Sequence, residues 1–201
     1  MIRAGLTGGY GCGKSFVSRL LEEWGCHVIR ADELGHRVLA RDGEAYEGVV
    51  AAFGGAILDA DGSINRKRLA EIVFNLPESL ERLNSIVHPA VIRLEEQFLD
   101  NLERTDPSGI GIVEAAILIE TGSYRRFDKL IVVACTQAQQ LQRAVERDGI
   151  SIEQARARIA RQMPVDKKRA YADYVIETSG SKEETVRQTS AVYEALRSLV
   201  K

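Results

Sequence analysis

The sequence lacks the features that mark membrane, secreted and nucleic-acid-coating proteins. None of its apolar runs approaches the ~18 residues of a membrane-spanning helix, and its first residues, "MIRAGLTGG", do not resemble a signal peptide. Its formal net charge of −2 over 201 residues disfavours a densely negative partner such as a nucleic acid or a membrane surface. We therefore expect a cytoplasmic protein without a nucleic-acid or membrane partner and without an obligate protein partner.

Cysteine is scarce as well. Only Cys12, Cys26 and Cys135 are present, and they are odd in number, far apart and free of any CxxC pair. This spacing argues against a disulfide framework and against a cysteine-based zinc site, and it indicates reduced thiols. The 45% hydrophobic and 28% charged residues are typical of a globular domain with a sizeable core.

Short apolar runs alternate with longer helical patterns along the chain. Five runs have the length and the β-branched content of strands: 2–6, 26–30, 109–114, 129–135 and 173–178. Helical patterns occupy 14–24, 32–39, 44–53, 66–74, 78–102, 138–148, 152–162 and 183–199. Strands that alternate with helices need crossover connections, so the pattern predicts an α/β fold, a mostly parallel sheet with helices on both faces.

Two helical segments are too long to be simple crossovers. The chain between the second and third strands has no convincing strand, which predicts an inserted helical region at about 32–108. A second, arginine-rich helical segment at about 137–172 separates the fourth and fifth strands. The core of this single domain then consists of about 1–31, 109–136 and 173–201.

The stretch "GLTGGYGCGKSFV" carries a phosphate-binding pattern in full. Gly8, four further residues and then Gly13-Lys14-Ser15 lie between an apolar strand and a helical pattern, which is the setting of a P-loop. The glycines let backbone N–H groups curl around a phosphate, and the following helix contributes its dipole. We expect Lys14 to reach the β- and γ-phosphates and the Ser15 hydroxyl to ligate Mg²⁺. ATP binding is assigned to Gly9, Gly11, Cys12, Gly13, Lys14, Ser15, Phe16 and, from the second insert, Arg147.

Cys12 lies inside this loop and has two interpretations. It is either a small residue that the loop tolerates or a modestly acidic, oxidisable thiol. The second interpretation follows from its surroundings, because backbone amides and Lys14 favour the thiolate.

The rest of the sequence separates the three classes of protein that share a P-loop. A switch GTPase needs a guanine-reading NKxD or TKxD tetrad, and a motor ATPase usually has a long apolar strand ending in Asp-Glu; both are absent. A small-molecule kinase needs a carboxylate that aligns the acceptor hydroxyl with the γ-phosphate. Asp32 follows the second strand, at the sheet edge that faces the loop, and is our candidate. Its alternative role is to cap the helix that follows.

Four further side chains are candidates, each with a structural alternative. Glu114 ends the third strand and either holds Mg²⁺ through water or is a solvent-facing strand end. Arg143 and Arg147 share one face of a predicted helix, where they would cover the phosphoryl group and exclude water unless they are only solvated surface charge. We select Arg143 as the catalytic arginine. His88 in "IVHPAVIR" either is structural or lines a site.

The order and spacing of these motifs resemble the dephospho-CoA kinase family over nearly the whole chain. The resemblance is carried by "LTGGYGCGKS", "ADELGH", "DGSINRKRLAEIVF", "LNSIVHPAV", "EAAILIETG", "QLQRAVERDGIS", "RQMP" and "ADYVIETSGS". It implies transfer of the γ-phosphate of ATP, with Mg²⁺, to the 3′-hydroxyl of the ribose in dephospho-CoA. It also implies a P-loop core, a helical CoA-binding region in the first insert and a helical lid in the second.

The resemblance implies roles for individual residues as well. Asp32 becomes the group that aligns the acceptor hydroxyl, His88 lines the dephospho-CoA site, and Arg143 belongs to the lid. Thr7 and Glu120 are assigned to substrate binding together with Asp32 and His88.

The chain departs from the family pattern at several positions. Phe16 stands where threonine is common, Glu114 where aspartate is common, and Thr178 where asparagine is frequent. Thr178 belongs to the segment "TSGS", which the resemblance places near adenine. The alternatives to this function are a P-loop kinase that acts on a nucleoside or nucleoside monophosphate and, from another class, a nucleotide-dependent switch.

Overall fold

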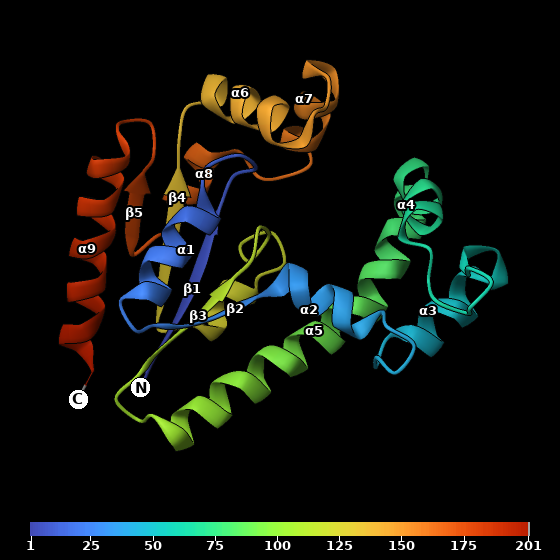
Figure 1. Cartoon of the computed structure of the whole chain (residues 1–201), viewed down its shortest axis with the longest axis horizontal. Helices are drawn as coiled ribbons and strands as arrows, with labels where there is room; N and C mark the ends of the chain where they lie inside the picture. Colours follow the sequence, from blue (N-terminus) through green and yellow to red (C-terminus); the bar gives the residue numbers. More distant parts are fainter. Residues whose placement is uncertain (201) are drawn as a thin grey trace. The chain divides into compact units, whose positions relative to one another are not determined.

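The computed structural model describes residues 1–200, and residues 74 and 75 by their backbone alone. In this part of the chain five strands form one sheet: β1 (Ile2–Gly8), β2 (His27–Arg30), β3 (Ile110–Glu114), β4 (Lys129–Ala134) and β5 (Tyr174–Glu177). The strand order is β2-β3-β1-β4-β5 (Figure 1). Each strand coincides with one of the predicted apolar runs, so the α/β prediction is confirmed.

The sheet is wound so that the carboxyl ends of its central strands meet at one edge. β1 pairs in parallel with β3 and with β4, and β4 pairs in parallel with β5. Parallel neighbours need a crossover, which explains why helices separate the strands in the sequence. Because β1 is the middle strand, the loop after it lies at the centre of the edge where parallel α/β sheets bind ligands.

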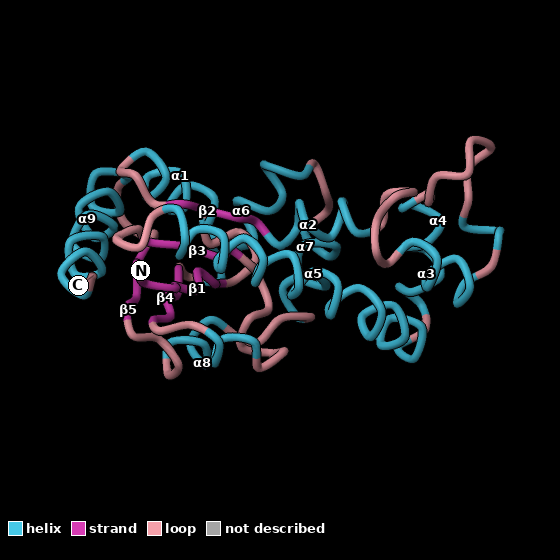
Figure 2. The backbone as a smooth tube through the Cα atoms, turned by 90° about the horizontal axis from the view of Figure 1, so that it is seen from below, coloured by secondary structure: helices cyan, strands magenta, loops and turns pink. Residues whose placement is uncertain are grey.

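One face of the sheet is covered by α1 (Lys14–Glu23) and α9 (Lys182–Leu199). Val17 of α1, Leu196 of α9 and Ile112 of β3 belong to the same buried cluster. Figure 2 shows the two helices together on one side of the strands. This apolar burial fixes the start of α1 relative to the end of β1.

The other face of the sheet meets the last turns of α5 (Pro77–Thr105). Side chains alternate along a strand, so Gly111 points away from the α1 and α9 cluster. A Cβ at Gly111 would lie 2.7 Å from Leu99 and 3.0 Å from Leu102, so glycine allows the helix to approach β3 closely. Arg3 of β1 also forms ion pairs with this part of α5.

The chain divides into two compact units, one of residues 1–29 and 99 onward, the other of residues 30–98. The predicted helical insert ran from about 32 to 108. The second unit ends ten residues earlier, inside α5, because the last turns of that helix pack against the sheet.

The second unit consists mainly of helices. It contains α2 (Ala31–Val38), α3 (Tyr46–Phe53), the 3₁₀ turn η1 (Gly55–Ile57), α4 (Arg66–Asn75) and the first part of α5. Asn65 caps α4, since its side chain accepts a hydrogen bond from the backbone N–H of Arg68. α5 continues through Pro89, as the helical pattern predicted for 78–102 does.

The second insert begins with two well-capped helices, α6 (Gln137–Asp148) and α7 (Ile152–Ala160). Thr136 and Ser151 each form a capping box with the glutamine three residues later, which explains the sharp starts of both helices. The short α8 (Val165–Arg169) and the 3₁₀ turn η2 (Ser123–Arg126) were not predicted, because four or five residues do not show a helical period. No helix in the described part of the chain is long and apolar enough to cross a membrane.

Candidate active site

The loop between β1 and α1 has the backbone that a P-loop requires. Gly11 and Gly13 have φ values of 75° and 84°, in the left-handed region that other residues rarely adopt. Gly8 is needed for a different reason, because a Cβ there would lie 2.2 Å from the carbonyl oxygen of Val133 in β4. The prediction that this loop depends on its glycines is confirmed.

Positive charge is concentrated at the start of α1. Gly13 is the N-cap, Lys14 is the first helical residue, and the first turn has no acidic side chain. The Lys14 Nζ donates hydrogen bonds to the carbonyl oxygens of Gly8 (3.3 Å) and Gly9 (3.2 Å), so its ammonium group folds back over the loop. Phe16 lies in the same turn and is half-buried. A helix N-terminus beside an ammonium group attracts phosphate oxygens.

Ser15 and Glu114 meet at the carboxyl edge of the sheet. The Ser15 hydroxyl donates a hydrogen bond of 3.2 Å to Oε1 of Glu114. Glu114 is the last residue of β3 and only 8% exposed. The alternative that Glu114 is a solvent-facing strand end is therefore wrong. β3 lies directly beside β1, which brings the carboxylate to the helix that follows the loop.

This pair fits the chemistry of a magnesium site. A hydroxyl and a carboxylate are hard oxygen donors, the kind that Mg²⁺ prefers. Among the described residues no group of three or more His, Cys, Asp or Glu side chains could hold a metal ion. Mg²⁺ is usually held by one or two protein oxygens together with substrate phosphates and water, so Ser15 and Glu114 are sufficient as protein donors.

The surroundings of Cys12 lower the pKa of its thiol, the direction that one of its two interpretations expected. Its sulfur is fully buried and accepts a hydrogen bond from the Cys135 thiol, with the two Sγ atoms 3.2 Å apart. That hydrogen bond, against the opposing effect of burial and helped by the charge of Lys14, lowers the pKa of Cys12 to about 7. The same contact and burial raise the pKa of the Cys135 thiol. Lys14 and the loop amides were the expected cause, but the largest effect comes from Cys135.

Arg143 reaches the loop through Thr178. Its two terminal nitrogens donate to the Oγ1 (2.9 Å) and the carbonyl oxygen (2.6 Å) of Thr178. The Thr178 hydroxyl in turn donates to the carbonyl oxygen of Cys12 at 2.8 Å. Helix α6, the end of β5 and the P-loop are thus connected by one chain of hydrogen bonds.

A second connection joins α6 and α7 to the loop through Tyr10. Its hydroxyl donates to Asp148 at the end of α6 and accepts from Arg158 of α7 at 2.7 Å. The Arg147 guanidinium binds both oxygens of Asp148 and lies 5.1 Å from the centre of the Tyr10 ring. The hydrogen bonds from Arg147 and Tyr10 hold the pKa of Asp148 at about 2. Arg147, a predicted ATP contact, is therefore held beside the loop by its neighbours.

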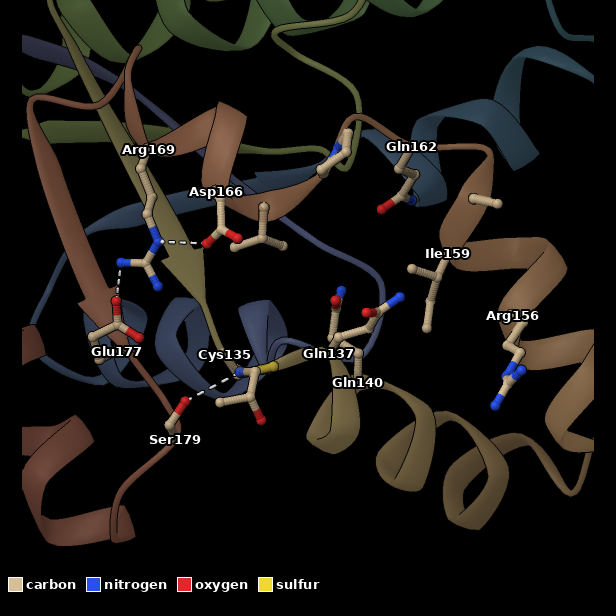
Figure 3. Close-up of a pocket in the computed structure, with 14 residues that line it drawn as sticks. Cys135, Gln137, Gln140, Arg156, Ile159, Gln162, Asp166, Arg169, Glu177 and Ser179 are labelled. Carbon is tan, nitrogen blue, oxygen red and sulfur yellow. Dashed lines mark hydrogen bonds and ion pairs between the residues drawn. The ribbon is translucent and has the colours of Figure 1, made fainter.

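A cavity of about 690 Å³ lies next to the loop (Figure 3). Gln140 and Val165 line it, and a Cβ at Gly9 would touch both. The Gln140 side chain also donates to the carbonyl oxygen of Tyr10 at 2.8 Å. Figure 3 shows the ion pairs of Arg169 with Glu177 and Asp166 on one side of this cavity.

Thr7 and Glu120, both assigned to substrate binding, take part in fixing the segment after β3. Thr7 is fully buried, and its hydroxyl donates to the carbonyl oxygen of Ala116 at 3.2 Å. The fully buried Lys168 of α8 donates to the same carbonyl oxygen at 2.6 Å and forms an ion pair with Glu120 at 2.8 Å. Glu120 also accepts a hydrogen bond from the backbone N–H of Met163. These contacts anchor α8 and the chain just before it to the core, and the substrate role of both residues stays a prediction.

The ion pair leads to a prediction about stability. Glu120→Gln should lower the free energy of unfolding by about 2 kcal/mol, because it leaves the Lys168 ammonium buried without its counterion. The loss is smaller than the ~3–5 kcal/mol of a fully buried pair, since the Glu120 side chain is 22% exposed. Urea titration measures it, and the double variant with Lys168→Met should recover part of the loss. Equal stability of Glu120→Gln and the unchanged chain would contradict the argument.

Asp32 and His88 lie in the second unit. Asp32 is exposed and is the second residue of α2. The N-cap of this helix is Arg30, and no side chain forms a capping hydrogen bond there. The alternative that Asp32 caps the helix is therefore wrong, because the helix begins at Ala31. His88 is half-buried in α5, and burial lowers its pKa.

Several residues of this site were missed by sequence reasoning. They are Tyr10, Cys135, Gln140, Asp148 and Lys168. An aromatic side chain in the middle of a glycine-rich loop was the one local signal, because Tyr10 is too large to be a neutral spacer there. The remaining residues are recognised only from contacts between distant parts of the chain.

Comparison with known proteins agrees with the geometry of the loop. The family model described as dephospho-CoA kinase matches residues 2–184. A dephospho-CoA kinase of Aquifex aeolicus is 44% identical over 196 residues, which cover 98% of each chain. A dephospho-CoA kinase domain-containing protein of Danio rerio is 40% identical over 199 residues, which cover 98% of this chain and 86% of the relative.

Solved structures have the same fold. A crystal structure from Thermus thermophilus superposes with a TM-score of 0.84 at 34% identity, over 100% of this chain and 98% of the other. A dephospho-CoA kinase from Campylobacter jejuni superposes with a TM-score of 0.73 at 26% identity, over 98% and 97% of the two chains. A shikimate kinase from Acinetobacter baumannii, at 16% identity and a TM-score of 0.54, shares the P-loop kinase fold alone. With a family model and full-length relatives in agreement, this chain belongs to the dephospho-CoA kinase family.

Proposed function

We propose that this chain transfers the γ-phosphoryl group of ATP to the 3′-hydroxyl of the ribose in dephospho-CoA, which yields coenzyme A and ADP. The observation that carries the proposal is family membership over residues 2–184 in a chain whose P-loop is complete. Relatives that bear the name dephospho-CoA kinase match nearly the whole chain, so the substrate-binding insert is included in the similarity.

The phosphate end of ATP binds at the loop in this proposal. Backbone N–H groups of the loop and the start of α1 surround the phosphates, and the Lys14 ammonium moves from the Gly8 and Gly9 carbonyl oxygens to the β- and γ-phosphates. Ser15 and Glu114 would hold Mg²⁺, which when bound neutralises part of the charge on the phosphates. The charge that spreads over the transferred group is thereby stabilised by groups already in position.

The acceptor end belongs to residues of the helical region. The Asp32 carboxylate orients the ribose hydroxyl and finally accepts its proton. It is exposed at the start of α2 and therefore accessible to a substrate. Burial lowers the pKa of His88, which favours the neutral imidazole, a form suited to a hydrogen bond with the acceptor. Thr7 and Glu120, in the first unit, are also proposed to bind substrate.

The lid supplies arginines and excludes water. Arg143 and Arg147 lie on α6 and are connected to the loop through Thr178 and through Tyr10 with Asp148. We assign Arg143 to the charge that develops on the transferred phosphoryl group and Arg147 to ATP. Because hydrogen bonds connect the lid to the loop, phosphates bound in the loop would influence the position of the lid.

Arg143→Ala should lower kcat about tenfold and raise the KM for dephospho-CoA much less, because an arginine that acts mainly in the transition state behaves in this way. Steady-state kinetics with dephospho-CoA varied at saturating ATP measure both values. Arg187→Ala removes an exposed arginine from α9 and is the control. A change in KM alone would make Arg143 an ordinary substrate contact.

The experiment that tests the function is ADP release by the purified protein with ATP and Mg²⁺, with and without dephospho-CoA. Release that depends on dephospho-CoA, with formation of an equal amount of coenzyme A, supports the proposal. Release with a nucleoside or nucleoside monophosphate but not with dephospho-CoA would identify a different small-molecule kinase. Slow release that no acceptor stimulates would identify a nucleotide-dependent switch.

A further inference from the structure

Two of the three cysteines of this chain lie side by side behind the phosphate loop. Cys12 belongs to the loop, and Cys135 directly follows β4, 123 residues later in the sequence. Their Sγ atoms are 3.2 Å apart, and both thiols are free and buried. The proposed reaction uses neither sulfur, so the proximity of the two thiols is not explained by phosphoryl transfer.

The two sulfurs differ in acidity, which suits them to react with each other. The Cys135 thiol donates a hydrogen bond to Cys12, and this contact together with the charge of Lys14 favours the thiolate of Cys12. Cys135 keeps its proton, because the same contact raises its pKa. A thiolate is the form that attacks a peroxide, and a neighbouring thiol is the group that resolves the product to a disulfide.

A cavity reaches one sulfur of the pair, that of Cys135, and the fully buried Cys12 sulfur lies 3.2 Å from it. Cys135 lines the cavity of about 690 Å³ and is 5% exposed. Figure 3 shows its sulfur between the end of β4 and Gln137 and Gln140 of α6. The side chains around the cavity are polar as well as apolar, so a peroxide that enters it meets hydrogen-bonding groups on the way to the sulfur.

We propose that Cys12 and Cys135 form an oxidation site at which hydrogen peroxide converts the two thiols into a disulfide that disables the phosphate loop. In the first step the Cys12 thiolate attacks one peroxide oxygen, the O–O bond breaks, and hydroxide leaves and takes up a proton, which gives a sulfenic acid and one water. In the second step the Cys135 sulfur attacks the Cys12 sulfur, the S–O bond breaks, and the hydroxyl leaves with the Cys135 proton as a second water. Two thiols are oxidised by two electrons, and one peroxide is reduced to two waters.

The disulfide would change the loop, because a bonded pair of sulfurs is about 2.05 Å apart. The sulfurs therefore have to approach by more than 1 Å from their separation of 3.2 Å. The Cys12 backbone belongs to the loop that would bind phosphates, and its carbonyl oxygen holds the Thr178 hydroxyl at 2.8 Å. A displacement of about 1 Å at a positioning group can reduce turnover by up to about a hundredfold.

Cys26 provides an internal control. It is buried in the core, burial raises its pKa to about 12, and no hydrogen bond joins it to another thiol in the described part of the chain. A thiol with so little thiolate at neutral pH reacts slowly with peroxide. Oxidation at this site should therefore consume two of the three thiols and leave Cys26.

The test exposes the reduced protein to hydrogen peroxide, quenches it with catalase, and counts thiols under denaturing conditions. We expect one remaining thiol, an intact mass lower by two hydrogen atoms, and a cross-linked peptide pair that contains Cys12 and Cys135. Cys26→Ala should form the same cross-link, whereas Cys135→Ser should never lose the two hydrogen atoms. The proposal would be overturned if three thiols remain after a peroxide treatment that fully oxidises the urea-unfolded protein. A cross-link that includes Cys26 would also overturn it.

The functional consequence is measured by ATP binding as well as by turnover, so that its outcome does not depend on the acceptor substrate. Oxidised protein should bind ATP at least about tenfold more weakly, and dithiothreitol should restore both binding and activity. ATP should in turn slow the loss of thiols. If the disulfide weakens ATP binding, bound ATP must disfavour the disulfide to the same degree. A disulfide that forms without any change in ATP affinity would overturn the claim that it disables the loop.

Discussion

Lys14→Ala is expected to lower the kcat of coenzyme A formation about a hundredfold or more. The Lys14 ammonium already lies over the loop, within 3.3 Å of two of its carbonyl oxygens, so it reaches the phosphates by a small movement. It would be the main side-chain counterion for the charge that spreads over the transferred phosphoryl group. The measurement is kcat with saturating ATP and dephospho-CoA, together with the melting temperature.

Lys182→Ala is the matched control for this variant. Lys14 and Lys182 are each the first residue of a helix, α1 and α9, so both substitutions remove a lysine from the same helical position. Only Lys14 follows the P-loop. Lys182→Ala should therefore turn over like the unchanged chain. Activity of Lys14→Ala within a few-fold of the unchanged chain would contradict the role assigned to this ammonium group.

Local patterns predicted the elements of the fold and the phosphate loop. Five apolar runs of strand length correspond to the five strands, and the runs are clearest in β1, β3 and β4, which are buried along nearly their whole length and are therefore mostly apolar. Lys14 and Ser15 could be placed from spacing alone, since the loop fixes their positions relative to Gly8 within one short segment. Patterns of this kind depend only on neighbours in the sequence.

The rest of the site depends on the order of the strands, which no local pattern contains. Cys12, Cys135 and Thr178 follow the carboxyl ends of β1, β4 and β5, and these three strands are neighbours in the sheet. Their contacts join residues that are 123 and 166 positions apart. The same order brings Glu114 of β3 to Ser15 and buries it, although a charged residue at a strand end usually faces solvent.

Asp32→Asn is expected to lower kcat about a hundredfold while ATP binding stays normal. The substitution removes the carboxylate that would orient the ribose hydroxyl and accept its proton. General-base contributions are about 10²–10⁴-fold, and a loose phosphoryl-transfer transition state places the expectation at the lower end. Stability should change by less than about 1 kcal/mol, because Asp32 is exposed and acts on α2 only through the helix dipole.

Glu33→Gln separates the effect on catalysis from the effect on the stability of α2. Asp32 and Glu33 are adjacent carboxylates in the first turn of α2, and both are exposed, so each amide substitution removes one negative charge from the same turn. If Asp32 acts in catalysis, the two variants should melt alike and differ about a hundredfold in kcat. An Asp32→Asn variant that turns over like Glu33→Gln would instead show that the Asp32 carboxylate contributes only to the helix dipole. The group that aligns the hydroxyl would then have to be another carboxylate, and Glu114, buried beside Ser15, is the next candidate.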